Sequence, residues 1–368
     1  MYPVFITHDI FRASAFGAHH PLSTARQPAV VDICHALGWL DPMQMAVAPQ
    51  ATVSQLERFH IRGYVQAVKE VSERGVATQD QRVRFNLGSM ECPVFAGVFD
   101  RARTTVGGAV RSAELALDGA VAFFPAGGTH HGRPDRASGF CYFNDPVFAI
   151  LTFLDAGLTR VAYVDLDAHH GDGVEAAFQT DSRVVLASLH EDGRWPGTGR
   201  LEDTCDGRAL NVPLPRGVTD TEYQAIVEQV LLPFLAQMRP QALVLVMGAD
   251  GLKGDPLSSM QLMNSTVWRV AQQCLDICSR AVVLGGGGYN PWTTARLWAG
   301  YWGNLAGYPL PSKLPGEVSR ILSELTCDLV DDEDHDPMWF ARLDDAPIDV
   351  PVRRDVEQLI EKLMVRAR

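Results

Sequence analysis

This sequence of 368 residues lacks the features of a membrane protein and of a disulfide-stabilised one. No uninterrupted apolar run reaches the roughly 20 residues that a membrane-spanning helix needs. The N-terminal segment MYPVFITHDIF has no basic stretch ahead of an apolar core. The seven cysteines are scattered, odd in number and without a Cys-x-x-Cys pair. These absences predict a protein of a reducing, cytoplasmic compartment with no membrane partner.

The chain also lacks an excess of basic residues. Its formal net charge is -12, which argues against nucleic acid as the main partner and is compatible with a cationic substrate. It has no internal repeat and no linker rich in proline, glycine or serine. Because 46% of the residues are hydrophobic, the chain can bury one large core, and we expect a single domain over residues 1–368.

Short apolar runs rich in β-branched residues alternate with segments of helical periodicity along most of the chain. This alternation is typical of a mostly parallel sheet with helices on both faces, and it predicts the α/β class. The predicted helices include residues 28–37, 53–71, 96–119 and 356–364, and the predicted strands are residues 4–6, 121–124, 161–164, 184–189, 242–247 and 281–284.

The most informative stretch is RVAYVDLDAHHGDGVEAAF, residues 160–178. It begins as a buried strand and then places Asp165, Asp167 and His169 at alternate positions, so these side chains point the same way from the strand's end. Two carboxylates and an imidazole directed at one point suit a divalent metal and are costly in an apolar core without one. The alternative is an acidic loop that merely follows a strand, but a further His-Gly-Asp-Gly run comes directly afterwards.

A tandem pair of histidines, His130 and His131, follows the predicted strand at 121–124 in the glycine-rich stretch PAGGTHHGRPDRASGFCYFND. Neighbouring residues of an extended chain point to opposite faces, so as strand residues the pair is poorly placed to bind one metal. In a loop, both can line a pocket as a paired acid and base. A satisfied structural histidine is the alternative for each of them.

The other polar residues of interest lie just past predicted strand ends. Asp250 ends the run ALVLVMGAD and could complete a three-ligand set with Asp167 and His169. The run GGGGYN lacks the lysine of a phosphate-binding loop and the spacing of a dinucleotide fingerprint, so we interpret it as a flexible turn that presents the hydroxyl of Tyr289. Ligands of open parallel sheets bind beyond the carboxyl ends of the strands. We therefore expect these residues, with Ser188, to meet at one site.

A series of stretches forms an ordered set between about residues 5 and 310, namely GGTHHG, SGFCYFND, YVDLDAHHGDGVE, SLHED with WPGTG, GADGLKGDP and GGGGY. In this set the chain resembles the zinc-dependent histone deacetylase family, including its bacterial deacetylase-like and acetoin-utilisation members. The resemblance implies the arginase/deacetylase fold, a single α/β domain around a mostly parallel eight-stranded sheet. It also implies a hydrolase that removes acetyl or other acyl groups from lysine side chains. We expect residues 311–368 to be a helical, acidic extension of the same domain.

Carried over position by position, the resemblance assigns roles to these residues. The implied ligands of zinc, with iron(II) as an alternative in the cell, are Asp167, His169 and Asp250. The implied catalytic residues are the tandem histidines, the carboxylate behind each and a tyrosine: His130 with Asp165, His131 with Asp172, and Tyr289. The implied substrate-binding residues are Glu91, Gly139, Phe140 and Trp195. The implied ligands of a structural potassium ion are Asp165, Asp167, His169, Ser188 and Leu189, and those of a second one are Phe178, Asp181 and Val184.

Some positions depart from the usual pattern of the family. Trp195 stands where a phenylalanine is usual, and Glu91 where an aspartate commonly holds the substrate backbone. Gly251 and Leu252 follow the last metal ligand, and Asp172 is the class I choice rather than the asparagine frequent in class II. These differences leave the chemistry intact and leave the natural substrate open.

The implied mechanism follows from what amide hydrolysis needs. A metal with three protein ligands and open positions polarises a carbonyl and brings the pKa of water towards neutrality. We expect His131 to act as general base and to pass the proton to the departing amine. His130, paired with Asp165, would stay an electrostatic partner. The Tyr289 hydroxyl would stabilise the oxyanion.

Three other hypotheses stay open. An acetylpolyamine hydrolase of the same fold would act on an acetylated small amine, which also suits an acidic protein. An arginase-like binuclear manganese hydrolase would need a second Asp-x-His-x-Asp set, which the chain lacks. A reader of acylated lysine would bind a peptide or protein without cleaving it, and would not need His131, Asp172 and Tyr289. The sequence does not fix the acyl chain or the oligomeric state.

Overall fold

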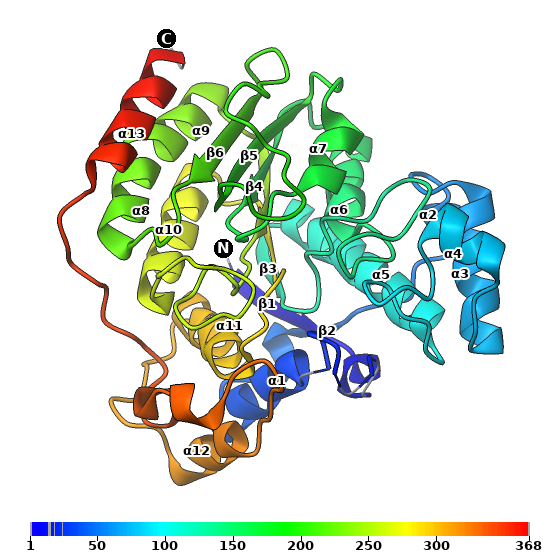
Figure 1. Ribbon diagram of the computed structural model, residues 1–368, viewed down its shortest axis with the longest axis horizontal. Coiled ribbons are helices and arrows are strands. Elements are labelled where there is room, and N and C mark those ends of the chain that lie inside the picture. The colour runs from blue at the N-terminus through cyan, green and yellow to red at the C-terminus, as the bar shows by residue number, and fades with distance from the viewer. Residues whose placement is uncertain (1, 14–15, 18, 24, 367–368) are drawn as a thin grey trace.

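The computed structural model describes residues 2–13, 16–17, 19–23 and 25–366. A single sheet of eight strands runs through its centre, in the order β2-β1-β3-β8-β7-β4-β5-β6, and every neighbouring pair is parallel (Figure 1). The expected eight-stranded parallel sheet is confirmed. The strands are β1 (Tyr2–Thr7), β2 (Met45–Val47), β3 (Ala120–Phe124), β4 (Val161–Asp165), β5 (Val184–Glu191), β6 (Ala209–Leu214), β7 (Ala242–Val246) and β8 (Ala281–Leu284).

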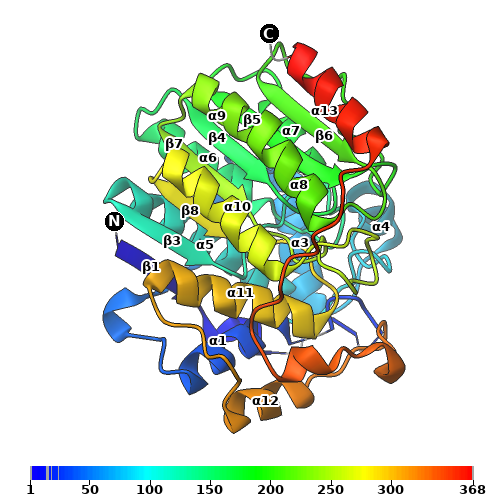
Figure 2. The ribbon, with the colours of Figure 1, turned by 90° about the vertical axis from the view of Figure 1, so that its left-hand side faces the viewer.

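Helices cover both faces of the sheet (Figure 2). The α-helices are α1 (Arg26–Ala36), α2 (Val53–Leu56), α3 (Arg62–Arg74), α4 (Gln79–Phe85), α5 (Val98–Leu117), α6 (Asp145–Asp155), α7 (Asp172–Phe178), α8 (Asp220–Ile226), α9 (Leu232–Met238), α10 (Asn264–Ile277), α11 (Pro291–Ala306), α12 (Gly316–Ser323) and α13 (Arg354–Arg366). A π-helical turn at Val227–Leu231 joins α8 to α9. In the part of the chain that the structure describes, no helix is both long enough and apolar enough to span a bilayer.

The two outermost strands, β2 and β6, are not predicted by the sequence pattern. Continuous apolar runs mark interior strands that are buried on both faces, whereas β2 has only three residues and Val47 is exposed. In β6, Asn211 and Pro213 interrupt the apolar run. The pattern therefore predicts the six interior strands and misses both edges.

The helix predicted over residues 53–71 is two helices, α2 and α3. A capping box between Thr52 and Gln55 starts α2. Between the two helices the chain bonds to a distant loop, because the Ile61 amide donates to Pro134 O at 2.8 Å and the buried His60 ring pairs with Arg133 O at 2.9 Å. These tertiary bonds override the helical periodicity.

Alternation along the strands divides the core into two layers. In β1, Phe5 packs on one face of the sheet, with residues of α1, α8, α9, α10 and α11. Val4 and Ile6 pack on the other, with residues of α5, α6 and α7. The helices α2, α3 and α4 form a smaller third cluster beside α5. Since all strands run the same way, the loops after them meet at one edge of the sheet, where the candidate functional residues lie.

The C-terminal segment after α11 returns across the helices of one face. In Figure 2 it passes from α12 over α11 and α10 to α13. The fully buried guanidinium of Arg296 donates to both carboxylate oxygens of Asp345, at 2.9 and 2.7 Å. Asn264 Nδ2 donates to Leu343 O at 2.6 Å, and Val356 of α13 lies in the same core layer as α8. We infer that residues 311–366 fold with the rest of the chain.

This inference predicts the effect of removing Asp345. In Asp345→Ala the buried Arg296 charge loses its partner, so we expect the free energy of unfolding to fall by about 3 kcal/mol. Denaturant unfolding measures the change. The matched control is Asp344→Ala, whose partner Arg342 is half exposed, and it should cost less than about 1 kcal/mol. Equal losses in the two variants would contradict the anchoring role of Asp345.

Candidate active site

Three buried side chains from two neighbouring strands converge at the carboxyl edge of the sheet. Asp167 and His169 follow β4, and Asp250 follows β7, which pairs with β4. One ligand atom of each lies within 4.8 Å of those of the other two. His169 Nδ1 is 2.9 Å from Asp250 Oδ2 and 3.2 Å from Asp167 Oδ1. The structure thus brings together the three residues that the sequence predicts as metal ligands.

The charges of this trio fit a divalent cation. Burial and the neighbouring charge of Asp167 raise the pKa of Asp250. Burial lowers the pKa of His169, but the two carboxylates outweigh burial and raise that pKa to about 10. The carboxylates therefore attract a positive charge, and a metal ion can replace the proton on His169. Two carboxylate oxygens and one imidazole nitrogen form a donor set that suits zinc or iron(II).

Each histidine of the tandem pair is bonded to its own carboxylate. His130 Nδ1 lies 2.7 Å from Asp165 Oδ2, and His131 Nδ1 lies 2.7 Å from Asp172 Oδ1. All four side chains are buried, and the two imidazole centroids are 3.9 Å apart. Because Nδ1 faces a carboxylate in both cases, Nδ1 carries a proton and Nε2 of a neutral ring is left as the acceptor.

The two adjacent histidines differ in charge. Burial lowers the pKa of His130, but Asp165 and Asp167 together raise it to about 9. For His131, burial and the neighbouring charge of His130 lower the pKa to about 3, against the opposing effect of Asp172. At neutral pH His130 is therefore a cation and His131 a neutral base. The roles of the two histidines in catalysis stay a prediction.

Two partners of these carboxylates were missed by the sequence analysis. The Tyr163 hydroxyl donates to Asp165 Oδ2 at 2.5 Å, and Arg133 forms an ion pair with Asp172 Oδ2. Strand alternation could have indicated Tyr163, because it precedes Asp165 by two residues on the same face. Arg133 lies in the loop of the tandem histidines, but nothing in the sequence relates it to Asp172.

The GGGGYN turn is packed against the metal trio. Its tyrosine, Tyr289, has its ring centroid 6.3 Å from that of His169 and 5.8 Å from that of Phe140. A Cβ at Gly287 would collide with the carboxylate of Asp250. Close approach to buried carboxylates therefore requires glycine in this turn, and its flexibility stays a prediction.

Two buried side chains that the sequence analysis did not single out hold this turn in place. Arg26 Nη1 donates to Gly286 O at 3.0 Å and to Gly288 O at 3.1 Å. Asp255 Oδ2 accepts from the Tyr289 amide at 2.7 Å. The GADGLKGDP motif contains Asp255 and could have indicated it, whereas Arg26 begins an unremarkable helix.

A cavity of about 460 Å³ leads to these groups. The four predicted substrate-binding residues line it, together with His131, His169 and Tyr289. The sequence analysis missed two further wall residues, Arg194 and Leu257. The complete wall consists of Glu91, His131, Gly139, Phe140, His169, Arg194, Trp195, Leu257 and Tyr289.

One buried carboxylate ties together two walls of this cavity. Glu191, at the end of β5, accepts from Arg194 Nη2 at 2.8 Å and from the Ser259 amide at 2.9 Å. Arg194 directly precedes Trp195, and Ser259 lies two residues after Leu257. The loops that carry Trp195 and Leu257 are therefore held at a fixed separation.

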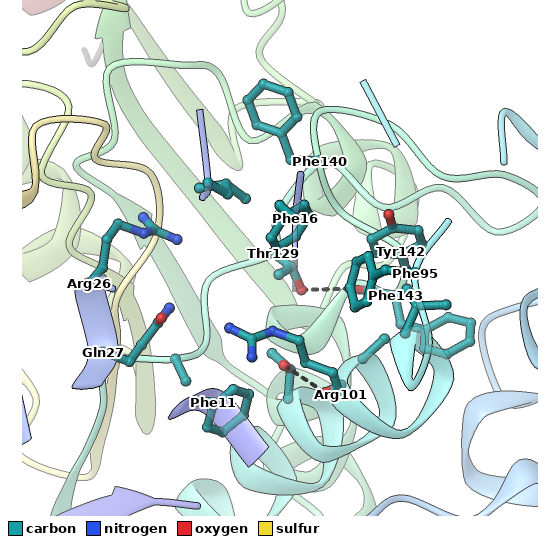
Figure 3. Close-up of a pocket in the computed structure, with 15 residues that line it drawn as sticks. Phe11, Phe16, Arg26, Gln27, Phe95, Arg101, Thr129, Phe140, Tyr142 and Phe143 are labelled. Atoms are coloured by element: carbon teal, nitrogen blue, oxygen red, sulfur yellow. Dashed lines mark hydrogen bonds between the residues drawn. The ribbon is translucent and has the colours of Figure 1, made fainter. Parts of the chain in front are cut away.

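A second cavity, of about 70 Å³, lies on the other side of Phe140, which lines both. Figure 3 shows Arg26 of α1 and Arg101 of α5 extending into it from opposite sides, among the rings of Phe11 and Phe16. Burial lowers the pKa of Arg101 only to about 10, so this side chain stays charged at neutral pH. We call the larger cavity the tunnel. Positive charge is thus concentrated on the side of Phe140 that faces away from the tunnel.

The predicted potassium ligands lie in two places. Asp165 and Ser188 are direct register partners in β4 and β5, and the first potassium site stays a prediction. At the second, Arg208 Nη1 already donates to Asp181 O at 2.8 Å and to Val184 O at 3.2 Å. A guanidinium thus supplies positive charge to two of the three residues, and this arrangement does not fit a potassium ion there.

Comparisons with known proteins agree with this geometry. Residues 20–305 match the family model described as histone deacetylase domain. Histone deacetylase 8 of Xenopus tropicalis is 36% identical over 298 residues, which cover 79% of this chain and 80% of that protein. Histone deacetylase 1 of Oryza sativa subsp. japonica is 38% identical over 314 residues, which cover 82% of this chain and 59% of that protein.

Two solved structures are similar over nearly the whole chain. An HDAC homolog from Aquifex aeolicus superposes with a TM-score of 0.94 and 31% identity, covering 99% of this chain and 100% of that one. An HDAC homolog complexed with SAHA has a TM-score of 0.93 and 30% identity, with 99% of both chains covered. The fold similarity therefore extends beyond residue 305.

The donor set predicts one bound divalent ion per chain. Removal of the ion by a chelator should lower the melting temperature, because the carboxylates of Asp167 and Asp250 then repel each other, and zinc or iron(II) should restore it. Elemental analysis after dialysis gives the stoichiometry. The variant Asp250→Asn, which removes one anionic ligand, should not retain the ion. Two transition-metal ions per chain would favour a binuclear centre instead.

Proposed function

The chain belongs to the histone deacetylase family of hydrolases, and we propose that it removes acetyl or other acyl groups from lysine side chains of proteins or peptides. One observation carries the proposal: His169 of the metal trio, a neutral His131 and Tyr289 line the same cavity. Hydrolysis of an amide needs a Lewis acid, a base and an oxyanion donor together. Binding alone would need none of them.

Asp167, His169 and Asp250 would hold zinc, with iron(II) as an alternative in the cell, and this ion when bound would polarise the acyl carbonyl and acidify water. His131 takes the proton from the attacking water at Nε2 and then donates it to the departing amine. Asp172 orients the ring through Nδ1. This accounts for a histidine that is buried and yet has a free nitrogen at the cavity wall.

His130 and Tyr289 stabilise the negative charge that develops on the substrate, and neither transfers the proton. His130 stays cationic beside Asp165, with Nε2 3.9 Å from Asp167 Oδ1, and offsets the negative charge that develops during attack. Burial raises the pKa of Tyr289 well above its ordinary value. The hydroxyl therefore remains protonated and can donate a hydrogen bond to the oxyanion.

The substrate-binding residues are assigned from the cavity wall. Phe140 and Trp195 line the cavity with aromatic rings that can pack against the aliphatic part of an acyl-lysine, and the backbone of Gly139 lies directly against Trp195. Glu91 lies at the same wall. Because a solved relative of the same fold is complexed with SAHA, we expect this chain to bind that compound.

All seven cysteines are free, which supports the proposal of a cytoplasmic location.

A substrate panel tests the proposal. Zinc-loaded protein is assayed with acetyl-lysine peptides, longer acyl-lysine peptides and acetylated polyamines, and we expect the highest kcat/KM for an acyl-lysine peptide. The net charge of -12 also suits the polyamine alternative, and a clear preference for acetylated polyamines would establish it. Tight binding of an acyl-lysine without any hydrolysis would establish a reader instead.

The proposed base predicts a shift in the pH profile. The carboxylate of Asp172 raises the pKa of His131, so Asp172→Asn should lower the pKa that governs the acid limb of the rate profile and should also reduce turnover. The measurement is kcat/KM against pH for the wild type and the variant. If the acid limb stays where it is, Asp172 does not act on the base.

The proposed oxyanion donor predicts a loss confined to turnover. Tyr289→Phe removes one oxygen and little volume. In the wild type, the Tyr289 hydroxyl bonds more strongly to the oxyanion than to the neutral carbonyl. Turnover of a good substrate should fall by roughly two orders of magnitude or more, while affinity changes by less than about tenfold. Steady-state kinetics with a direct binding measurement separate the two effects. Intact turnover in Tyr289→Phe would remove the tyrosine from the mechanism.

A further inference from the structure

We propose that Glu91 determines the shape of the acyl-lysine tunnel by holding its Gly139–Phe140 wall from behind, instead of holding the peptide backbone of the substrate. The inference rests on the proposed function of the tunnel. It concerns a position where the sequence has glutamate and the resemblance implies an aspartate that binds substrate. The additional methylene changes what the carboxylate can reach.

Both carboxylate oxygens of Glu91 are engaged by donors of the chain itself. Oε1 accepts a short hydrogen bond from the Gly139 amide. Oε2 accepts from Asn86 Nδ2 at 2.8 Å, and the same Asn86 amide donates to Ala137 O at 3.1 Å. The carboxylate therefore links the loop after α4 to the segment that forms the tunnel wall.

The wall segment has a backbone that needs such support. Gly139 and Phe140 both have left-handed conformations, with φ of +54° and +65°. A bulky residue rarely adopts this conformation, which costs free energy unless the surroundings enforce it. Ser138 and Cys141 exchange backbone hydrogen bonds of 3.1 and 2.8 Å across the turn. Glu91 adds a bond from outside the turn, at the first of the two left-handed residues.

This wall touches the groups proposed to carry the chemistry. A Cβ at Gly139 would collide with the rings of His131 and Trp195, so the backbone at this point lies directly against both. The next residue, Phe140, packs edge-on against Tyr289 with centroids 5.8 Å apart. A shift of the turn would therefore change the width of the tunnel between base and oxyanion donor. Glu91 is a positioning residue that acts through Gly139.

The proposal has a consequence for the class of substrate. Each oxygen of the Glu91 carboxylate already accepts a hydrogen bond from the chain, which orients the carboxylate toward the wall rather than toward the amides of a bound peptide. Recognition should then depend on the acylated side chain and much less on the backbone that carries it. We expect the protein to accept acylated alkylamines that have no flanking amide.

Two variants separate the two roles of Glu91. Glu91→Asp keeps the charge at the wall but is one methylene too short for the Gly139 amide. Glu91→Gln keeps the length and an acceptor oxygen but loses the charge. Each is assayed with two substrates that share the same acetylated amine, an acetyl-lysine peptide and N-acetylbutylamine. Thermal unfolding confirms that both variants are folded.

If Glu91 supports the wall, kcat/KM should fall on the order of tenfold in Glu91→Asp, by the same factor for both substrates, and by less in Glu91→Gln. If Glu91 instead held the backbone of the substrate, kcat/KM should fall more in Glu91→Gln than in Glu91→Asp, and only for the peptide. Either that pattern or unchanged kcat/KM in both variants would overturn the proposal.

A binding measurement keeps this test separate from that of the proposed function. The affinity of the zinc-loaded protein for SAHA reports on the tunnel without turnover. If the wild type hydrolyses neither substrate, the proposed function fails. The wall role then still predicts weaker SAHA binding in Glu91→Asp than in Glu91→Gln, and equal affinities would refute it.

Discussion

Burial of a carboxylate away from water is costly unless a cation or a hydrogen-bond donor meets it, and the architecture of this site follows from that constraint. Parallel strands bring the carboxyl ends of β4 and β7 to one edge. Asp165 ends β4, Asp167 follows it, Asp172 begins α7, and Asp250 follows β7. Two of the four are met by the tandem histidines. Asp167 and Asp250 have His169 between them, and here a metal is the natural counter-charge.

The same constraint explains why two adjacent histidines differ in their pKa values. His130 has carboxylate charge from both Asp165 and Asp167, whereas His131 has Asp172, which is already paired with Arg133. The cation forms where the negative field is larger, and its charge then disfavours protonation of the neighbouring ring. A neutral base therefore results from the arrangement of the acids, although both residues are of the same type and equally buried.

The sequence alone predicts the fold class, the interior strands and most of the polar residues at the site, because strand periodicity and short motifs are local signals. The sequence alone does not predict the edge strands β2 and β6, or the residues that hold the loops of the site in place. Arg26 contacts the Gly286–Gly288 segment across about 260 positions of the chain, and no local pattern encodes such a contact. The need for glycine in that segment is not encoded locally either, since only the folded chain shows Asp250 against it.

The tunnel walls come from loops that follow different strands, and each is held by a carboxylate that does not take part in the chemistry. Glu91 accepts from the Gly139 amide, Glu191 from Ser259 and Arg194, and Asp255 from the amides of Leu257 and Tyr289. A hydrogen bond from a backbone amide positions the loop, and it can form whatever side chain the loop residue has. A wall side chain such as Trp195 can therefore be exchanged without displacing the metal trio or the tandem histidines. Asp255 also positions Tyr289, so one wall of the cavity and the proposed oxyanion donor share a support.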